Sequence, residues 1–347
     1  MAIEHLVIHA PNVYQGGGRT LLAALLRALD VDAKGHLLLD RRLEIPFSAP
    51  CGMTVRTFAP TLAGRLRAEA FLPRVAQAAS RVICFGGLPP LRPCRGHVAV
   101  FVQNRNIVGR TDVSEYPLKQ RLRIALERLW FHRYSKHADQ FVVQTETMHD
   151  LLRRMLGRRP DIRVAPLVPE ELLQPSRALS NGAGKTYDFC YVSTGEPHKN
   201  HRRLVAAWIV LAQQQWFPSL CLTVSPREFP RLHRWIADMR QQHGLNIDNV
   251  GYVTNDRIDE IYACSRALVY PSLYESFGLP LVEARGHGLK LVAPERDYVR
   301  DIVVPDECFD PTSARSIARA IERLCRGDNA RRAFIDARGF MSSLQAA

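Results

Sequence analysis

Short apolar runs alternate with longer amphipathic stretches along almost the whole chain. The apolar runs have lengths that suit β-strands and cover residues 6–10, 36–40, 81–85, 97–103, 140–144, 187–193, 219–224, 267–271 and 289–294. Stretches with helical spacing separate them, at residues 19–29, 61–79, 117–137, 145–156, 199–215, 229–243, 255–263, 279–288 and 312–326. Because apolar strands that alternate with helices are typical of parallel sheets covered on both faces, the pattern predicts an α/β protein.

The polar, glycine-containing stretch 177–185 interrupts this alternation, and a fresh strand-like run follows it. A chain of 347 residues has a length that suits two domains. We therefore expect two Rossmann-like, doubly wound domains, residues 1–176 and 186–326, with 177–185 as the linker. Ligands of such sheets bind outside the carboxyl ends of the strands, so the functional site is expected in the cleft between the domains.

The chain is basic, with 47 Lys and Arg against 34 Asp and Glu and a net charge of +13. This charge favours an anionic partner such as nucleic acid, anionic lipid or a phosphorylated substrate, although an arginine-rich composition from a GC-rich genome gives the same balance. Eight cysteines without a C-x-x-C pair predict reduced thiols. No apolar run approaches the roughly 20 residues of a membrane span, and the first residues do not read as a signal peptide. A cytoplasmic protein, soluble or peripheral to a membrane, is expected.

The segment 270–284, YPSLYESFGLPLVEA, carries the most specific chemical pattern. A strand-like run ends where it begins, and Pro280 predicts the first turn of a helix. Free N–H groups and the positive end of the helix dipole make such a start a site for an anion. The N–H groups expected to receive a diphosphate or sugar hydroxyls are those of Phe277, Gly278 and Leu279. Two carboxylates, Glu275 and Glu283, flank this site and can accept strong hydrogen bonds from hydroxyl groups.

The spacing Glu275-x7-Glu283 around the letters SFGLP resembles the E-x7-E motif of the group 1 (family 4) retaining glycosyltransferases, which have the GT-B fold. The resemblance implies that Glu275 contacts the donor sugar and that Glu283 holds the nucleotide ribose. It also places Ser276 at the donor site. It implies that residues 327–347 form a helix that returns toward the first domain. The alternative for the two acids is an ordinary role as solvated caps of a helix.

The segment 191–201, YVSTGEPHKNH, resembles the loop of this family that ends in Lys-Asn or Lys-Gly. The resemblance implies that Lys199 neutralises the leaving diphosphate and that Asn200 lies beside the donor. Lysine supplies a compact charge that suits phosphate. Many relatives carry an Arg where this chain has Thr194, so one expected cation is missing. An exposed lysine at a helix start is the alternative for Lys199.

Glycines follow the first strand-like run in the segment NVYQGGGRT, and we expect Gly17 and Gly18 to allow a close approach of the donor. The segment resembles the glycine-rich loop of the same family, and it fits neither the G-x-G-x-x-G fingerprint nor a P-loop. The candidates on the acceptor side are Gln103, Asn104 and Arg105, where many relatives place a His. A plain structural turn is the alternative for that loop.

The stretch 117–137 is basic and amphipathic, with an apolar side made by Leu118, Leu122, Leu126, Leu129 and Trp130. Two alternatives stay open. The helix packs this side on the core and exposes a solvated basic face, or it lies on an anionic membrane surface.

The pair Asp30 and Asp32 matches a D-x-D metal signature but lies at the wrong sheet edge, so we treat it as a chance match. No histidine spacing suggests a metal site. The resemblance likewise implies that neither a metal nor another cofactor is needed.

The family resemblance implies a function as well as a fold. It implies a retaining glycosyltransferase that moves a hexose from a nucleotide-diphosphate sugar to a hydroxyl of a glycan or polyprenyl-linked glycan, in O-antigen or capsule assembly. Two alternatives are a GT-B epimerase or hydrolase of sugar nucleotides and a non-catalytic basic protein that binds a membrane surface. Nucleic acid is not an expected partner, because aromatic residues do not interleave the basic ones as in an RNA-binding platform.

Overall fold

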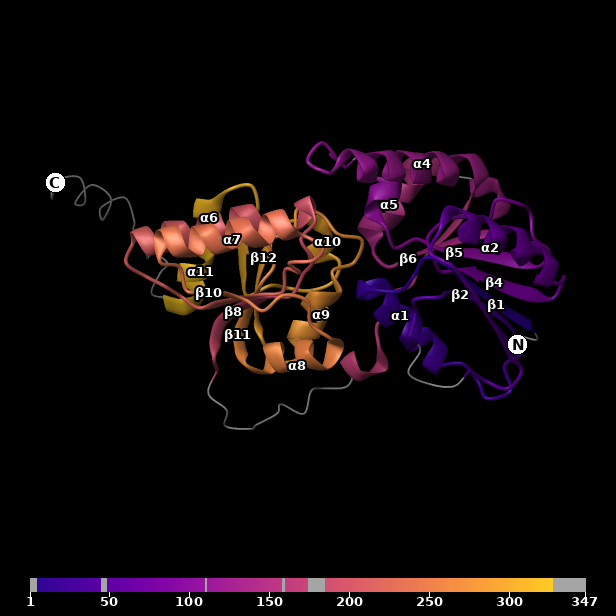
Figure 1. Ribbon diagram of the computed structural model, residues 1–347, viewed down its shortest axis with the longest axis horizontal. Coiled ribbons are helices and arrows are strands. Elements are labelled where there is room, and N and C mark those ends of the chain that lie inside the picture. Colours follow the sequence, from indigo (N-terminus) through magenta and orange to yellow (C-terminus); the bar gives the residue numbers. More distant parts are fainter. Residues whose placement is uncertain (1–4, 45–48, 110, 158–159, 174–184, 327–347) are drawn as a thin grey trace, which may run out of the picture.

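The computed structural model describes residues 5–44, 49–109, 111–157, 160–173 and 185–326. Two separate parallel sheets lie side by side along the long axis of the molecule, each with helices on both faces (Figure 1). The α/β class and the two doubly wound sheets predicted from the sequence are confirmed. The expected linker, apart from Lys185, and the expected last helix at 327–347 lie outside the described residues.

The first sheet has the strand order β3-β2-β1-β4-β5-β6-β7, and every neighbouring pair is parallel. Its strands are β1 (His5–Ala10), β2 (Gly35–Asp40), β3 (Met53–Phe58), β4 (Ser80–Cys84), β5 (His97–Phe101), β6 (Gln140–Val143) and β7 (Asp161–Val164). Its α-helices are α1 (Gly16–Arg27), α2 (Leu62–Val75), α3 (Arg105–Val108), α4 (Leu118–Tyr134) and α5 (Glu146–Leu156). The strand order reverses between β1 and β4, which is where such sheets bind ligands.

The second sheet has the strand order β10-β9-β8-β11-β12-β13 and is also parallel. Its strands are β8 (Tyr187–Tyr191), β9 (Leu220–Leu222), β10 (Ile247–Asn249), β11 (Ser265–Val269), β12 (Lys290–Pro294) and β13 (Glu307–Phe309). Its α-helices are α6 (His201–Gln213), α7 (Pro230–His243), α8 (Asn255–Ala263), α9 (Leu279–Gly286), α10 (Asp297–Arg300) and α11 (Ala314–Arg326). The order reverses between β8 and β11, so the loops after these two strands meet at one edge.

The central strands are buried on both faces, which explains their continuous apolar runs. Along β2, Leu38 packs in one cluster with Leu72 of α2, whereas Leu37 and Leu39 pack in another with Leu22 of α1. Successive side chains of a strand point to opposite faces, so each face of the sheet has its own core. The second half has one large core that includes the fully buried Trp208 of α6.

The strands that the sequence pattern did not reveal are β3, β7, β10 and β13, which are the edge strands of the two sheets. An edge strand has a neighbour on one side only and needs less apolar surface. In β3, for example, the residues between Met53 and Phe58 are all exposed. Their sequences are therefore too polar to stand out.

Helix α4 forms where the sequence predicted it, but its leucine side does not pack on the core. Leu118, Leu122, Leu126 and Leu129 are 77%, 61%, 58% and 64% exposed. The buried residues of the helix are Ile124 and Phe131, two turns apart on another stripe. The alternative in which the four leucines pack on the core is therefore wrong, because the helix turns Ile124 and Phe131 inward instead.

Among the helices of the described residues, none combines the length and the hydropathy needed to cross a lipid bilayer.

Candidate active site

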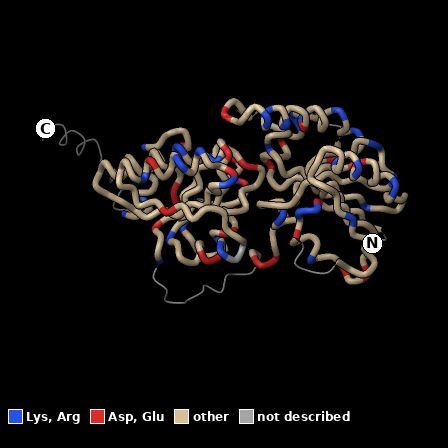
Figure 2. Tube along the Cα trace, in the orientation of Figure 1, with Lys and Arg blue, Asp and Glu red and all other residues tan. Residues whose placement is uncertain are grey.

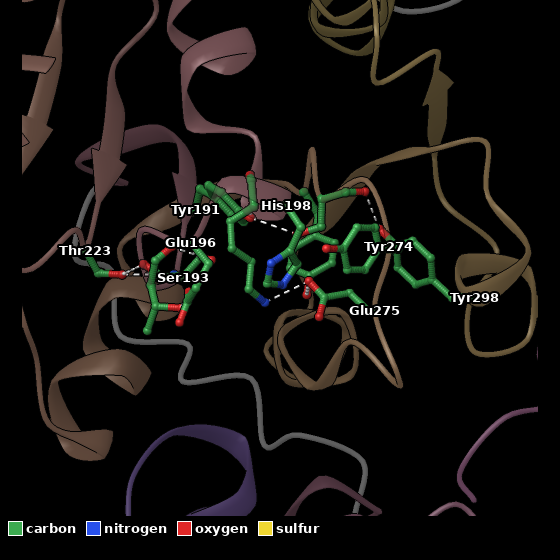
Figure 3. A network of polar contacts seen from close by, with 12 residues as sticks. Tyr191, Ser193, Glu196, His198, Thr223, Tyr274, Glu275 and Tyr298 are labelled. Atoms are coloured by element: carbon green, nitrogen blue, oxygen red, sulfur yellow. Dashed lines mark hydrogen bonds and ion pairs between the residues drawn. The ribbon is translucent and has the colours of Figure 1, made fainter. Parts of the chain in front are cut away.

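Lys199 and Glu275 come together at the point where the strand order of the second sheet reverses. Figure 3 shows Glu275 among the polar side chains around it. Lys199 ends a short 3-10 helix, Pro197–Lys199, that follows β8, and Glu275 lies in the loop between β11 and α9. The distance from Lys199 Nζ to Glu275 Oε1 is 2.7 Å, and the two side chains are only 16% and 11% exposed. Because β8 and β11 are neighbours, their carboxyl ends carry both residues to one place.

Mutual attraction keeps this pair ionised despite its burial. Burial acts to lower the pKa of Lys199, but the charge and hydrogen bond of Glu275, together with Tyr191 and Glu196, outweigh burial and raise that pKa above its ordinary value. Burial acts to raise the pKa of Glu275, but the charge and hydrogen bond of Lys199, together with His198 and Ser272, outweigh burial and lower that pKa. At neutral pH the site therefore holds an ammonium group and a carboxylate in contact.

Buried tyrosines hold the Lys199–Glu275 pair and its two loops in place through hydrogen bonds. Tyr270 donates its hydroxyl hydrogen to Glu275 Oε1 over 3.0 Å. The hydroxyl of Tyr191 lies 2.9 Å from the carbonyl oxygen of Lys199 and 2.9 Å from Ser272 Oγ. Tyr298 donates to the carbonyl of Ser272 over 2.8 Å (Figure 3). Both loops are thus held at the backbone, which leaves the charged ends of the pair little freedom.

Asn200 turns the chain from the 3-10 helix into α6. Its φ of 61° and ψ of 30° are left-handed, a conformation that asparagine adopts more readily than most residues. Its side-chain amide donates to the carbonyls of Pro271 and Pro311 over 3.1 and 2.8 Å. The structure therefore gives Asn200 a bracing role behind the site, with its amide N–H groups directed at the backbone.

The start of α9 lies beside the same loop. Gly278 precedes it with a φ of 96°, and no side chain caps the helix. The N–H groups of Phe277, Gly278 and Leu279, for which the sequence predicts an anion site, lie at this helix start. The Ser276 carbonyl accepts a hydrogen bond of 3.2 Å from Thr145 Oγ1, which belongs to the first half.

The glycine-rich loop of the first half faces α9. A Cβ added to Gly17 would lie 3.9 Å from Leu279 Cδ2, and one added to Gly18 would lie 3.5 Å from Gln103 Oε1. Gln103 also donates to the Phe85 carbonyl over 3.0 Å. The starts of α1 and α9 therefore approach each other across the two halves, with Gln103 beside them.

The other two acceptor-side candidates differ in their surroundings. Asn104 accepts a hydrogen bond of 3.0 Å from the N–H of Asn106 and caps α3. Arg105 lies with its guanidinium carbon 5.5 Å from the ring centroid of Tyr274, the neighbour of Glu275. Burial lowers the pKa of Arg105. Arg105 thus brings a cation from the first half toward the Glu275 loop, whereas Asn104 is engaged locally.

A ring stack of the second half, which the sequence did not reveal, makes hydrogen bonds to the first half at this point. The rings of His198 and Tyr274 are stacked, with centroids 4.8 Å apart and planes 12° from parallel. The hydroxyl of Tyr116, from the loop before α4, lies 2.6 Å from His198 Nδ1. Burial first, and the Lys199 charge next, lower the pKa of His198 to about 4, so its ring is neutral at pH 7. Tyr274 also donates to Asn106 Oδ1 over 3.1 Å.

Glu283 lies in its own polar environment. Its Oε2 accepts a hydrogen bond of 3.0 Å from the hydroxyl of Tyr262 in α8. Burial raises the pKa of Glu283 to about 7, so the carboxyl group exchanges its proton near neutral pH. Unlike Glu275, it has no cationic partner among the described residues.

The remaining sequence candidates lie elsewhere or make local bonds. Thr194, which stands where relatives have an Arg, donates its hydroxyl hydrogen to the carboxylate of Glu196. Asp30 and Asp32 are exposed in the turn between α1 and β2, at the amino edge of the sheet. No group of three or more His, Cys, Asp and Glu side chains within the described ranges is arranged to hold a metal ion.

Comparison with known proteins gives one family match. Residues 176–338 match the family model for glycosyl transferases group 1. Among curated proteins, the chain is 31% identical over 113 residues to the O-antigen chain mannosyltransferase B of Escherichia coli, covering 33% of this chain and 30% of that protein. It is 28% identical over 135 residues to the serotype-specific mannosyltransferase WbdA of the same species, covering 37% of this chain and 16% of that protein. The chain therefore spans less than a third of the length of these relatives.

Solved structures share the fold over nearly the whole chain. Sucrose-phosphate synthase from Thermosynechococcus elongatus has a TM-score of 0.67 at 19% identity, covering 94% of this chain and 90% of that one. Anabaena Alr3699/HepE, solved in complex with UDP and glucose, has a TM-score of 0.63 at 16% identity and covers 94% and 91%. At these identities the likeness concerns the fold alone.

Proposed function

Because residues 176–338 belong to the glycosyl transferases group 1, we propose that the protein is a retaining glycosyltransferase that uses a nucleotide-diphosphate sugar. It moves a hexose to a hydroxyl group of a glycan or lipid-linked glycan. The observation that carries this proposal is the contact of Lys199 with Glu275 beside the uncapped start of α9.

The site has the parts that departure of a nucleoside diphosphate requires. Negative charge develops on the leaving phosphate, and fixed positive groups stabilise it without reorganisation. Lys199 supplies a cation, and the N–H groups at Phe277, Gly278 and Leu279 supply the positive end of α9. When the donor enters, its diphosphate shares the ammonium group with Glu275. Because position 194 carries no Arg, Lys199 is the main cation that the second half offers to the diphosphate in this proposal.

The carboxylate of Glu275 is suited to hold the sugar. An ionised carboxylate accepts hydrogen bonds from hydroxyl groups and does not donate. Tyr270 and Lys199 both bind Oε1, and the carboxylate keeps further acceptor capacity for sugar hydroxyls. Glu283, whose pKa lies near neutrality, receives the ribose in this proposal.

The first half supplies the acceptor side. Gly17 and Gly18 leave the start of α1 open next to α9, and Gln103 lies beside them. Arg105, from the same half, lies with its guanidinium group over the ring of Tyr274, next to Glu275 in the sequence. The acceptor hydroxyl enters between these groups and the donor sugar.

The relatives favour a role in surface polysaccharide assembly. The curated matches are mannosyltransferases, one of them of the O-antigen chain, so mannose is the first hexose to test. The structural neighbour from Anabaena was solved with UDP and glucose, so UDP-glucose is the second.

A thermal-shift screen against nucleoside diphosphates and their sugars tests the proposal. A ligand that binds only the folded state raises the melting temperature. A rise with one nucleotide sugar, and transfer of its hexose only when an acceptor is added, is the expected result. Consumption of the sugar nucleotide without an acceptor identifies an epimerase or hydrolase instead. No response to any nucleotide sugar, together with salt-sensitive binding to anionic vesicles, identifies a non-catalytic membrane protein.

The exposed leucines of α4 favour a cytoplasmic enzyme that is peripheral to an anionic membrane. They form one stripe at positions 118, 122, 126 and 129, and the basic residues beside them on the exposed surface are Lys119, Arg121, Arg123 and Arg133. Lys and Arg positions gather along α4 in Figure 2. Apolar side chains that enter the lipid boundary and cations that meet anionic headgroups are the two components of such binding.

A further inference from the structure

A basic cavity of about 410 Å³ lies at the outer edge of the first sheet, between β3 and α2. Its lining residues come from the end of β2, from β3 and from one side of α2, and they are Arg41, Arg56, Thr57, Phe58, Ala59, Gly64, Arg67, Ala70, Phe71 and Arg74. In Figure 1, α2 lies on the side of the first half that points away from the second sheet. The cavity is therefore distinct from the Lys199–Glu275 centre.

The spacing along α2 explains how its part of the wall arises. Gly64, Arg67, Phe71 and Arg74 recur every three or four residues and so share one face of the helix. A Cβ on Gly64 would lie 2.1 Å from the Ala59 carbonyl oxygen, so only glycine lets α2 start this close to the end of β3. The close approach closes one end of the cavity.

All charged side chains that line the cavity are positive. Its lining contains four arginines and neither Asp nor Glu. Of the nearby acids, Asp40 binds Arg42 through both carboxylate oxygens, at 3.0 and 2.8 Å. Glu69 is buried and lies 3.1 Å from Arg65.

Because these acids are engaged by other arginines, the cavity arginines lack an ion-pair partner within the described ranges. The arginines concerned are Arg41, Arg56, Arg67 and Arg74.

One of these arginines is held in place by packing. The guanidinium carbon of Arg56 lies 4.1 Å from the ring centroid of Phe71 and 5.9 Å from that of Phe58. A stacked guanidinium keeps its edge N–H groups free for a ligand and loses little freedom on binding. The cavity thus combines an ordered cation with three more around it.

We propose that this cavity is a binding site for a phosphate or diphosphate ester. Guanidinium groups match phosphate oxygens through paired hydrogen bonds. The volume lies in the range of small-molecule sites, so there is space for more than one phosphate group. The site is additional to the donor site and does not depend on the proposed transfer reaction.

Titration calorimetry with inorganic diphosphate tests the site by its stoichiometry. The wild-type protein binds two diphosphates, one at Lys199 and one in the cavity. The double variant Arg67→Gln/Arg74→Gln keeps the helix propensity of α2 and is expected to bind the cavity diphosphate about ten-fold or more weakly, because it loses charge-assisted hydrogen bonds to the phosphate oxygens. The variant Arg67→Lys/Arg74→Lys keeps the charge and recovers part of the affinity.

A matched control removes the same charge from another helix. Arg231 and Arg234 are exposed on α7, and Arg231→Gln/Arg234→Gln leaves the isotherm unchanged. If the donor site were absent but the cavity real, the wild type would bind one diphosphate and the cavity variant none. An isotherm for Arg67→Gln/Arg74→Gln that matches the wild type, with an unchanged melting temperature, overturns the proposal.

Vesicles identify the source of the phosphate. Phosphatidylglycerol vesicles that bind the wild type and release it on addition of diphosphate indicate a lipid headgroup, provided that Arg67→Gln/Arg74→Gln binds them less. Vesicle binding that is equal in wild type and variant indicates a soluble phosphate ester. In both cases the loss of diphosphate binding in the variant is required.

Discussion

Lys199 Nζ lies 2.7 Å from Glu275 Oε1, although 76 positions of sequence separate the two residues. The contact results from the strand order, because β8 and β11 are neighbours at the point where that order reverses. Lys199 ends a short 3-10 helix and Glu275 lies within the loop before α9, and buried tyrosines hydrogen-bond to both. The pair is thus a product of the fold and stands where a diphosphate sugar is proposed to react.

Replacement of Lys199 by Met should lower turnover by a factor of about 10²–10³, the loss that follows removal of one preorganised stabilising group from a transition state. The variant also leaves a buried carboxylate without its cation, which is destabilising. Turnover of the nucleotide sugar and the melting temperature are measured together. In Lys199→Met/Glu275→Gln the melting temperature should recover while turnover stays low.

The exposed Lys34 provides the control for this series, since Lys34→Met removes the same charge far from the pair. Normal turnover in Lys199→Met would exclude the role proposed for this residue.

His198 should make stability depend on acidity. Its pKa is lowered to about 4 in the folded protein, whereas an unfolded histidine has a pKa of about 6.5. Between these values the unfolded chain binds more protons, so stability is present above pH 6.5 and is lost as the pH falls toward 4. His9 and His201 also have lowered pKa values and add to the slope.

The variant His198→Asn keeps an acceptor for Tyr116. It should reduce the number of protons taken up on unfolding by about one in this range, so the unfolding free energy should depend less steeply on pH. Denaturant titrations at several pH values measure this slope, with the exposed His132→Gln as the control. An unchanged slope would show that His198 is already protonated or exposed in the folded state.

Gly278→Ala should weaken donor binding as well as stability. The φ of 96° costs a residue with a Cβ about 1–2 kcal/mol, and the Cβ would lie 3.3 Å from Leu281 Cδ1 at the start of α9. Gly288, two residues beyond α9, has a φ of 74° and open space around it. Gly288→Ala therefore carries similar backbone strain without touching the proposed diphosphate site.

Melting temperatures and nucleotide-sugar affinities of these two glycine variants separate strain from function. Both should melt at lower temperature, and only Gly278→Ala should lose affinity. Equal affinities in the two variants would argue against an anion site at this helix start.

Leu122→Ser/Leu126→Ser should reduce binding to anionic vesicles by about ten-fold or more, because burial of one leucine contributes about 1.5–3 kcal/mol. The side chains are 61% and 58% exposed, so the melting temperature should hardly change. Cosedimentation with vesicles measures the binding, and added salt should weaken it for the wild type.

The control for this prediction makes the same kind of change at exposed apolar residues elsewhere. Leu173→Ser/Val304→Ser alters side chains that are 72% and 86% exposed and lie outside α4. If the two double variants bound vesicles equally, the stripe on α4 would have no special part in membrane contact.

The sequence was most informative where a motif coincides with a strand end. Lys199 and Glu275 follow buried strands, and the rule for carboxyl ends of parallel strands places them at one edge. Tyr116 and His198 gave no such signal, because they are 82 positions apart and meet only when the two halves pack together. No local pattern encodes a contact of that kind.

The helix α4 shows a second limit of sequence patterns. A stripe of leucines predicts an apolar face, but the pattern does not say which partner covers it. Here Ile124 and Phe131 are buried, and the leucines are exposed. The edge strands were not predicted for a related reason: an exposed strand needs few apolar residues, so its sequence shows no apolar run.

The hydrogen bond from Thr145 to the Ser276 carbonyl ties the loop of one half to a helix of the other. In a second such bond, the N–H of Thr147 donates to Asp301 Oδ2 over 2.8 Å. Parting the halves breaks both ties and loosens the segment that holds Glu275. By linkage, a molecule that binds more tightly when this segment is held would also favour the packed arrangement of the halves.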